Sequence, residues 1–316
     1  MRRSVPLPRG AGSYPNLYVA NYGGNSVTVY APGSTSVLRT IRDGVEVPDA
    51  LAFDSAGNLY VANYYGNYYG TVTVYAPGST SLLRTISQGV KAPVSLAFDA
   101  AGNLYVGNCI CYQYTDVTVY APGSGTVLRT ITQGVDWPQA LAVDGGGNLY
   151  VANTGSNPNS VTVYAPGSTS VERTISAGVG DPFALAFDRT GNLYVGNHGI
   201  NSVTAYAAGR TKLLRTISKG VSGPGQGLAF DNAGSLYVTN FFNSTVTVYR
   251  RGRNVLRRTI SQGVNGPNGL AFDSAGNLYV ANYGGSTVTV YAPGRKNVLR
   301  TIAQGLGEPA ALAFGP

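Results

Sequence analysis

Short apolar segments recur along this chain in a fixed order, separated by glycine, asparagine, proline and serine. One recurring segment, Leu-Ala-Phe or Leu-Ala-Val, starts at Leu51, Leu96, Leu141, Leu185, Leu228, Leu270 and Leu312. Another, Leu-Tyr-Val, starts at Leu17, Leu59, Leu104, Leu149, Leu193, Leu236 and Leu278. Successive starts of the first segment lie 42 to 45 residues apart. A period of this length is typical of solenoids, propellers and repeat arrays.

The second unit shows what one repeat contains. Its four apolar runs are Leu51–Phe53, Leu59–Asn63, Thr71–Ala76 and Leu82–Ile86, all rich in residues that favour strands. No stretch has the 3.6-residue period of an amphipathic helix. The link 54–58, Asp-Ser-Ala-Gly-Asn, has the composition of a tight hairpin turn. Each unit therefore predicts four short antiparallel strands.

The repeat predicts an all-β fold, a seven-bladed β-propeller of four-stranded antiparallel blades. Runs such as Leu59–Ala62 are apolar at consecutive positions, which requires burial on both faces of the sheet, as between two blades. The first unit lacks its opening segment, whereas the C-terminus carries a spare one at 312–314. We expect the ring to close by pairing of this C-terminal strand in the N-terminal blade. Residues 16–316 then form a single domain after a leader segment, 1–15.

Side chains that recur once per repeat are interpreted as structural. Fourteen of the 23 tyrosines occupy two fixed positions of the unit, and we expect them to pack between blades. Six aspartates open the Asp-x-x-Gly turns, and seven asparagines that end the second strand are expected to bond the upper loops. Seven arginines on the outermost strands are interpreted as charge that discourages association of exposed edges.

The leftover aromatic side chains gather on one side. In an antiparallel blade, the links from strand two to three and from strand four to the next blade share one face, here called the upper face. The other two links lie on the lower face. Apart from Tyr14, every aromatic residue outside the repeated positions falls in upper-face links. The residue after the proline of each inter-blade link is expected near the central mouth.

We therefore hypothesise a ligand-binding upper face. Its candidate residues are Tyr22, Asp49, Tyr64, Tyr65, Tyr68, Tyr112, Trp137, Gln139, Phe183, His198, Gln226, Phe241, Asn268 and Tyr283. Rigid aromatic side chains among Asn, Ser, Thr and Gly are typical of adaptable binding surfaces. The alternative is that these aromatics only cap the hydrophobic layers of the propeller.

Charge is distributed unevenly along the chain. The net charge is +8, and residues 159–316 hold fourteen basic and six acidic side chains. Seven cations are expected on the outer lower rim of blades five to seven: Arg210, Lys212, Arg250, Arg251, Arg253, Arg295 and Lys296. They favour either weak attraction to an anionic surface or a merely solubilising rim. No apolar run is long enough to span a membrane.

The sequence offers little for catalysis. His198 is the single histidine, and no nucleophile motif accompanies it. Cys109 and Cys111 are interpreted as thiols or a local disulfide, because a zinc site would need two further ligands. We expect no catalytic residue, no metal and no cofactor. The composition, poor in charge and rich in Gly, Asn, Thr, Ser and Tyr, favours an extracytoplasmic or secreted bacterial protein, although no export signal is visible. We expect a monomer.

The strings Asn58-Leu-Tyr-Val-Ala-Asn63 and Val72-Thr-Val-Tyr75, with Gly89-Val90 and Pro93 before the next Leu-Ala-Phe-Asp, resemble NHL-repeat and YVTN-type β-propellers over residues 16–316. Relatives of this class include protein- and RNA-binding modules, surface-layer proteins, gluconolactonases and virginiamycin B lyase. The resemblance implies an acid-rich metal site over the channel for a lactonase and catalytic histidine for the lyase. Here Asp49 is the single acid at the mouth position, and His198 stands alone.

Two functions remain open. The first is a non-enzymatic propeller that binds a glycan, a cell surface or a protein through its upper face. The alternative is a metal-dependent lactonase- or lyase-like enzyme with its site at the upper channel mouth. Because the mouth lacks a mixed cluster of Asp, Glu and His, the sequence favours the binding function.

Overall fold

The computed structural model describes residues 15–65, 69–110, 114–156 and 158–316. Its strands form seven separate four-stranded antiparallel sheets, and a 3-10 turn, η1 (Tyr283–Gly285), is the one helical element among these residues. The predicted seven-bladed propeller is confirmed. The described part of the chain contains no helix with the length and hydropathy needed to cross a bilayer.

The innermost strands of the blades all begin at a proline. They are β4 (Pro48–Phe53), β8 (Pro93–Phe98), β12 (Pro138–Val143), β16 (Pro182–Phe187), β20 (Pro224–Phe230), β24 (Pro267–Phe272) and β28 (Pro309–Gly315). Each contacts the inner strands of both neighbouring blades, so the seven form a closed ring. The second strands are β1 (Asn16–Asn21), β5 (Leu59–Asn63), β9 (Leu104–Ile110), β13 (Leu149–Asn153), β17 (Leu193–Asn197), β21 (Leu236–Asn240) and β25 (Leu278–Asn282).

The third and fourth strands complete each blade outward. The third strands are β2 (Ser26–Tyr30), β6 (Thr71–Tyr75), β10 (Tyr114–Tyr120), β14 (Ser160–Tyr164), β18 (Ser202–Tyr206), β22 (Thr245–Tyr249) and β26 (Thr287–Tyr291). The outermost strands are β3 (Val37–Ile41), β7 (Arg84–Ile86), β11 (Val127–Ile131), β15 (Arg173–Ile175), β19 (Leu213–Ile217), β23 (Leu256–Ile260) and β27 (Val298–Ile302). The second unit thus differs from its prediction only at strand ends.

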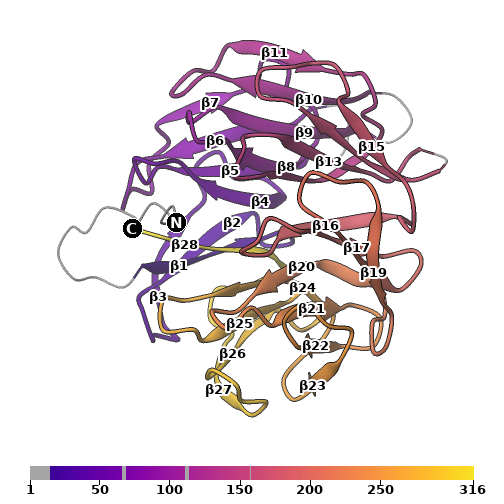
Figure 1. Cartoon of the computed structure of the whole chain (residues 1–316). Coiled ribbons are helices and arrows are strands. Elements are labelled where there is room, and N and C mark those ends of the chain that lie inside the picture. The colour runs from indigo at the N-terminus through magenta and orange to yellow at the C-terminus, as the bar shows by residue number, and fades with distance from the viewer. Residues whose placement is uncertain (1–14, 66–68, 111–113, 157) are drawn as a thin grey trace.

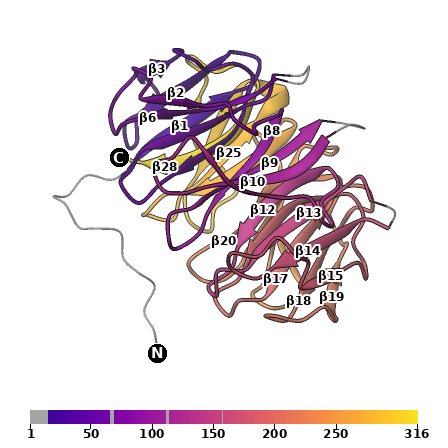
Figure 2. The ribbon, with the colours of Figure 1, turned by 90° about the horizontal axis from the view of Figure 1, so that it is seen from above.

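The ring closes as predicted. The first sheet has the order β28-β1-β2-β3, and Tyr18 pairs with Ala313 while Val19 pairs with Leu312. Figure 1 shows the yellow C-terminal strand beside the indigo N-terminal one, and Figure 2 places them together from a second direction. Residues 1–14 of the proposed leader lie outside the described residues.

The hydrophobic core is divided into seven clusters, one between each pair of neighbouring blades. The fourteen repeated tyrosines are all at most 3% exposed, which confirms their packing between blades. Tyr75 illustrates the third-strand position, because its hydroxyl donates to the Asp43 carbonyl of the preceding blade's link at 2.5 Å. Tyr60 illustrates the second-strand position, where its ring meets Phe98 of the next blade edge-on. Tyrosine therefore joins blades through apolar area and a hydrogen bond together.

The outer-strand arginines make a contact within the blade that was not predicted. In six blades the guanidinium lies over the ring of the second-strand tyrosine at 5.6–5.9 Å, and in the same blades it donates to that tyrosine's hydroxyl. All seven side chains are half-buried. The structure thus gives these arginines a packing role within the blade, since the long stem covers the aromatic ring. Their role as charge that discourages edge association stays a prediction.

Candidate functional site

The same set of hydrogen bonds recurs in every blade and holds the residues at the upper mouth. Asn63, buried at the end of β5, donates to Thr71 and Thr73, and its Oδ1 accepts from the backbone of Glu46 at 3.1 Å. The equivalent asparagines of the other six blades also bind the link in this way. The prediction that these asparagines bond the upper loops is confirmed. They fix the link that delivers the mouth residue.

A second contact fixes the start of the upper loop. The Tyr64 N–H donates to the Val47 carbonyl at 3.0 Å, and Val47 has a φ of 46°. The residue before the proline has a positive φ in every blade, at Val47, Ala92, Trp137, Asp181, Gly223, Gly266 and Glu308. A left-handed conformation is unfavourable for residues other than glycine, so this geometry is imposed by the surrounding contacts.

The mouth residue itself lies in a bulge. The pairing of β4 with β5 shifts register between Pro48 and Ala50, which leaves Asp49 out of the ladder. Gln139 and Phe183 occupy the same place in blades four and five. A bulge redirects the side chain that it carries. These residues are thus part of the inner strands, not of the links as the sequence suggested.

An open depression of about 230 Å³ lies where the first four blades meet at the mouth. It is lined by Tyr22, Asp49, Tyr64, Val94, Cys109 and Gln139. Four of these six residues were predicted. The sequence had identified Val94 as a mouth residue but not as part of a site, and Cys109 was considered only for its thiol chemistry. The Gln139 amide lies 3.6 Å from the Cys109 sulfur. Cys111 lies outside the described residues.

Asp49 carries the one carboxyl group among the described residues that line this depression. Burial raises the pKa of Asp49 to about 7, because the charged form has lost most of its hydration. At neutral pH both the acid and the carboxylate are therefore populated. Such a group can donate a hydrogen bond to a ligand or accept a proton from one, which an ordinary surface aspartate cannot do.

Tyr283 and Glu308 extend this side of the mouth. The rings of Tyr22 and Tyr283 are 6.0 Å apart, and the Tyr283 hydroxyl donates to the Glu308 carboxylate at 3.1 Å. Burial, with the hydrogen bond and charge of Glu308, raises the pKa of Tyr283 to about 12. Burial and the charges of Asp49 and Glu308 also raise the pKa of Tyr22. Both phenols stay protonated and remain hydrogen-bond donors.

The aromatic residues of blades five and six form a separate cluster. The His198 ring stacks on Phe183 at 4.6 Å and meets Phe242 edge-on at 4.8 Å, while Phe241 adjoins Phe242. The His198 Nδ1 lies 3.2 Å from the Pro224 carbonyl. Phe242 is 62% exposed, so the cluster presents an apolar ring to solvent.

Gln226 and Asn268 tie the inner strands of the last blades together. The Gln226 backbone donates to the Asn268 side chain at 3.4 Å, and that side chain donates to the Ala310 carbonyl at 3.3 Å. Trp137 supplies the left-handed residue of its link, and its carbonyl accepts from Thr154. Tyr65 lines a different hollow with Tyr69 and Glu46. Tyr68 and Tyr112 lie outside the described residues.

The predicted site is therefore divided. Tyr22, Asp49, Tyr64 and Gln139 meet in one depression with Tyr283 beside it, whereas Phe183, His198 and Phe241 form the second cluster. Within the described ranges, no three His, Cys, Asp or Glu side chains gather in a group that could hold a metal ion. The described residues of the mouth do not fit the acid-rich metal site implied by the resemblance to lactonases.

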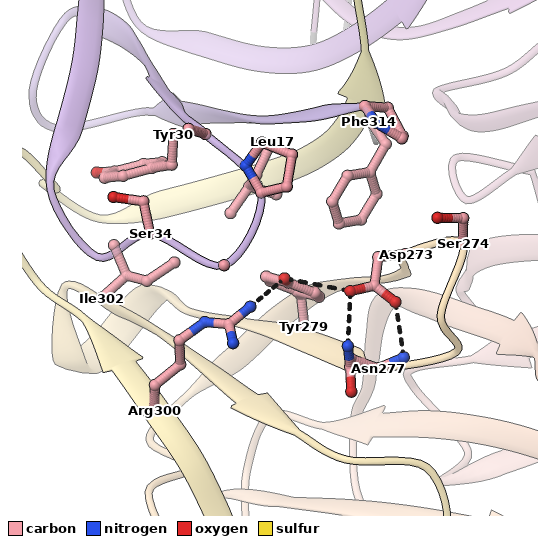
Figure 3. Close-up of a pocket in the computed structure, with 14 residues that line it drawn as sticks. Leu17, Tyr30, Ser34, Asp273, Ser274, Asn277, Tyr279, Arg300, Ile302 and Phe314 are labelled. Atoms are coloured by element: carbon pink, nitrogen blue, oxygen red, sulfur yellow. Dashed lines mark hydrogen bonds between the residues drawn. The ribbon is translucent and has the colours of Figure 1, made fainter. Parts of the chain in front are cut away.

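The lower face has a crevice of about 160 Å³ between blades seven and one. Figure 3 shows its polar groups engaged with one another, since Arg300 donates to Tyr279, and Asp273 accepts from Tyr279 and from the backbone and side chain of Asn277. Aspartate opens the same turn in five further blades. Because this set is a repeated structural unit, we assign the crevice no ligand.

Comparisons with known proteins agree with the fold and say less about the site. The family profile described as SMP-30/gluconolactonase/LRE-like region matches residues 185–316, which is 132 of the 316 residues. This segment runs from inside β16 to the end of the chain. It excludes all six residues that line the depression. No curated protein matches the chain.

Similar solved structures cover nearly the whole chain. A functionally unknown protein from Desulfotomaculum acetoxidans has a TM-score of 0.79 at 15% identity, with 95% of this chain and 99% of that one covered. A putative 6-phosphogluconolactonase from Bacteroides fragilis has a TM-score of 0.79 at 16% identity, covering 98% and 100%. A putative 6-phosphogluconolactonase from Bacteroides uniformis has a TM-score of 0.76 at 12% identity, with 96% of this chain and 100% of that one covered. At these identities the likeness establishes the propeller fold alone.

Proposed function

We propose that the upper mouth of this propeller binds a small hydroxylated molecule of about monosaccharide size. The observation that carries this proposal is the depression of about 230 Å³ in which Asp49 lies with Tyr22, Tyr64 and Gln139. Small-ligand sites combine apolar and aromatic walls with a few converging polar groups. Here the phenol rings supply the walls, while the carboxyl and the amide supply directional hydrogen bonds.

The protonation behaviour of Asp49 supports a neutral polyhydroxylated ligand. With a pKa of about 7, the carboxyl can bind as the neutral acid, which avoids burying a charge beneath the ligand. Among the described residues no basic side chain lines the depression, and Glu308 adds negative charge beside it. A phosphorylated ligand would therefore be repelled.

Binding can be tested with a panel of neutral monosaccharides and aldonolactones by isothermal titration calorimetry. For whichever compound binds, Tyr64→Ala and Asp49→Ala should each weaken binding at least tenfold. Tyr65→Ala is the matched control, because this neighbouring tyrosine lines a different hollow. Equal losses in Tyr64→Ala and Tyr65→Ala, or no binding of any compound at millimolar concentration, would contradict the proposal.

A second candidate function is hydrolysis of an unphosphorylated lactone at the same place. It is favoured by the pKa of Asp49, which suits a general base near neutral pH, together with the lactonase-type names among the comparisons. The Asp49 carboxylate would take a proton from water as the oxygen attacks the lactone carbonyl carbon. The ring C–O bond then breaks, and the proton passes to the leaving oxygen to give the hydroxy acid. Tyr22, which stays protonated, would donate to the carbonyl oxygen.

Hydrolysis is distinguished from binding by turnover. Gluconolactone hydrolysis should rise with pH to a plateau above about 7, and Asp49→Asn should lower kcat about 100-fold or more with a smaller change in KM. Saturable binding without turnover would support the binding function and contradict hydrolysis. Faster turnover of the 6-phospho lactone than of the neutral one would contradict the charge argument.

A further inference from the structure

The turns between the third and fourth strands differ in one position between two parts of the ring. In blades one to four this position is Ser34, Ser79, Ser124 and Ser168, whereas in blades five to seven it is Arg210, Arg253 and Arg295. The turn itself is unchanged, because each of these residues donates its N–H to the carbonyl three positions earlier at 2.9–3.0 Å. The preceding glycine has a positive φ in all seven turns.

The arginines replace a residue that stabilises the turn. Ser34 Oγ accepts from the Ser36 N–H at 3.0 Å and donates to the Ser36 carbonyl at 3.1 Å, and the other three serines make the same pair of bonds. Arginine has no acceptor and cannot reproduce the first bond. Three consecutive blades therefore give up a local turn interaction and gain an exposed cation.

Other cations surround these three arginines. Lys212, Arg250, Arg251 and Lys296 lie in the same turns, and all seven side chains are exposed. We call these seven residues the basic arc. Arg257, on the edge of β23, is exposed too. Among described residues the one ion pair is Arg173–Glu172, which belongs to blade four. Although Asp188, Asp231 and Asp273 lie on the same face, their carboxylates accept hydrogen bonds from their own turns.

We propose that the basic arc binds a linear acidic polysaccharide, a chain bearing carboxylate or sulfate groups. Blades five to seven are consecutive, so their outer turns form a curved row on the rim, and Figure 1 shows β19, β23 and β27 following one another. Five of the seven cations are arginines, whose planar guanidinium can bind carboxylate or sulfate through two parallel hydrogen bonds. A flexible polyanion can follow this row and place one anionic group after another on it.

The surroundings of the basic arc disfavour two other kinds of anionic ligand, lipid surfaces and nucleic acids. A flat lipid surface would also meet the lower turns of blades two to four, which carry no cation. Duplex DNA is stiff over about 150 base pairs and would touch the curved rim only at a tangent. Single strands are bound largely by base stacking on aromatic rings. The exposed aromatic residues of the described chain, Tyr65, Tyr69, Phe241 and Phe242, all lie on the upper face.

The test uses the full chain and fluorescein-labelled heparin and polygalacturonate, with binding followed by anisotropy between 50 and 200 mM salt. The variant Arg210→Ser/Arg253→Ser/Arg295→Ser restores the residue of blades one to four, so it should fold without loss of stability. We expect at least tenfold weaker binding at low salt. The slope of log affinity against log salt should fall by about 2, as three contacts at about 0.7 each are lost.

The matched control, Arg42→Ser/Lys91→Ser/Lys219→Ser, removes the same charge from the upper face and should leave affinity within about twofold. Equal losses in both triple variants would mean that only net charge matters and would overturn the site. Tighter binding of duplex DNA or of phosphatidylglycerol vesicles at equal ionic strength would overturn the polysaccharide assignment. Asp49→Ala should not affect this binding, so the outcome is independent of the proposed upper-face function.

Discussion

In blade two, the side chain of Asn63 bonds Val61, Thr71, Thr73 and the backbone of Glu46. In blade six, Asn240 makes the same four kinds of contact, with Val238, Thr245, Thr247 and the backbone of Ser222. The exposed positions of the same blades share much less. Blade two contributes Asp49 and Tyr64 to the depression and has a Ser79 turn, whereas blade six carries the Phe241–Phe242 pair and the Arg253 turn.

The comparison separates what holds the ring from what the ring presents. Blades one to four and blades five to seven have the same buried asparagine, tyrosine and half-buried arginine, because each blade must fit between two others. Their loops meet no such requirement and differ in charge and aromatic content. Interior substitutions should therefore have equal effects in both parts of the ring, and loop substitutions should have local ones.

The buried asparagines provide the largest expected effect. Asn63→Ala and Asn240→Ala should each lower the free energy of unfolding by about 4 kcal/mol, since each leaves several buried polar groups without partners. Chemical denaturation of the two variants measures this. A difference of more than about 1.5 kcal/mol between them would break the equivalence of the two parts.

Asp49→Asn should make the mouth position of blade two like that of blade seven, which already has asparagine, Asn268. The substitution should therefore remove the pH dependence of stability that Asp49 causes. The folded pKa of Asp49, about 7, exceeds its usual value of 3.8, so the folded state favours the protonated form. The stability of the wild type is then full below pH 3.8 and falls as pH rises through 7. The variant should equal the wild type near pH 4 and exceed it by roughly 3 kcal/mol at pH 8. Thermal unfolding that shows no gain at pH 8 would contradict the burial of this carboxyl.

Removing one tyrosine hydroxyl should have a smaller effect. Tyr75→Phe and Tyr249→Phe lose the bonds to the Asp43 and Lys219 carbonyls, at 2.5 and 2.7 Å, while the buried ring remains. We expect each to cost about 1.5 kcal/mol, measured by urea unfolding. An unchanged midpoint in either variant would show that water replaces that bond and that the two junctions differ.

The outer turns should give the smallest effects, with opposite signs in the two parts. Ser79→Arg should destabilise blade two by about 0.5–1 kcal/mol through loss of the Ser81 contacts, and Arg253→Ser should stabilise blade six by a similar amount. Paired melting curves test this. The same sign in both variants would mean that the serine bonds do not contribute to stability.

The sequence predicted the ring because its period is visible in the buried positions. Leu51, Val61 and Tyr75 recur unchanged in every unit, because burial on both blade faces left little choice for these positions. The packing of the outer arginines was not predicted, since position alone does not show that the long side chain of Arg84 folds back over Tyr60. The contact of Glu308 with Tyr283 was not predicted, because it joins residues 25 positions apart in the sequence.

The sequence by itself determined the number of blades, the antiparallel order within them and the closure at Leu312, because each follows from a repeated local pattern. Only the tertiary structure decided which upper-face residues meet. Asp49, Tyr64 and Gln139 converge while Phe183 and His198 form a separate cluster, although all belong to the same repeat positions or loops. The physical reason is that the repeat fixes where each loop starts but not which side chains of different loops come together, because contacts between blades join residues that lie far apart in the sequence.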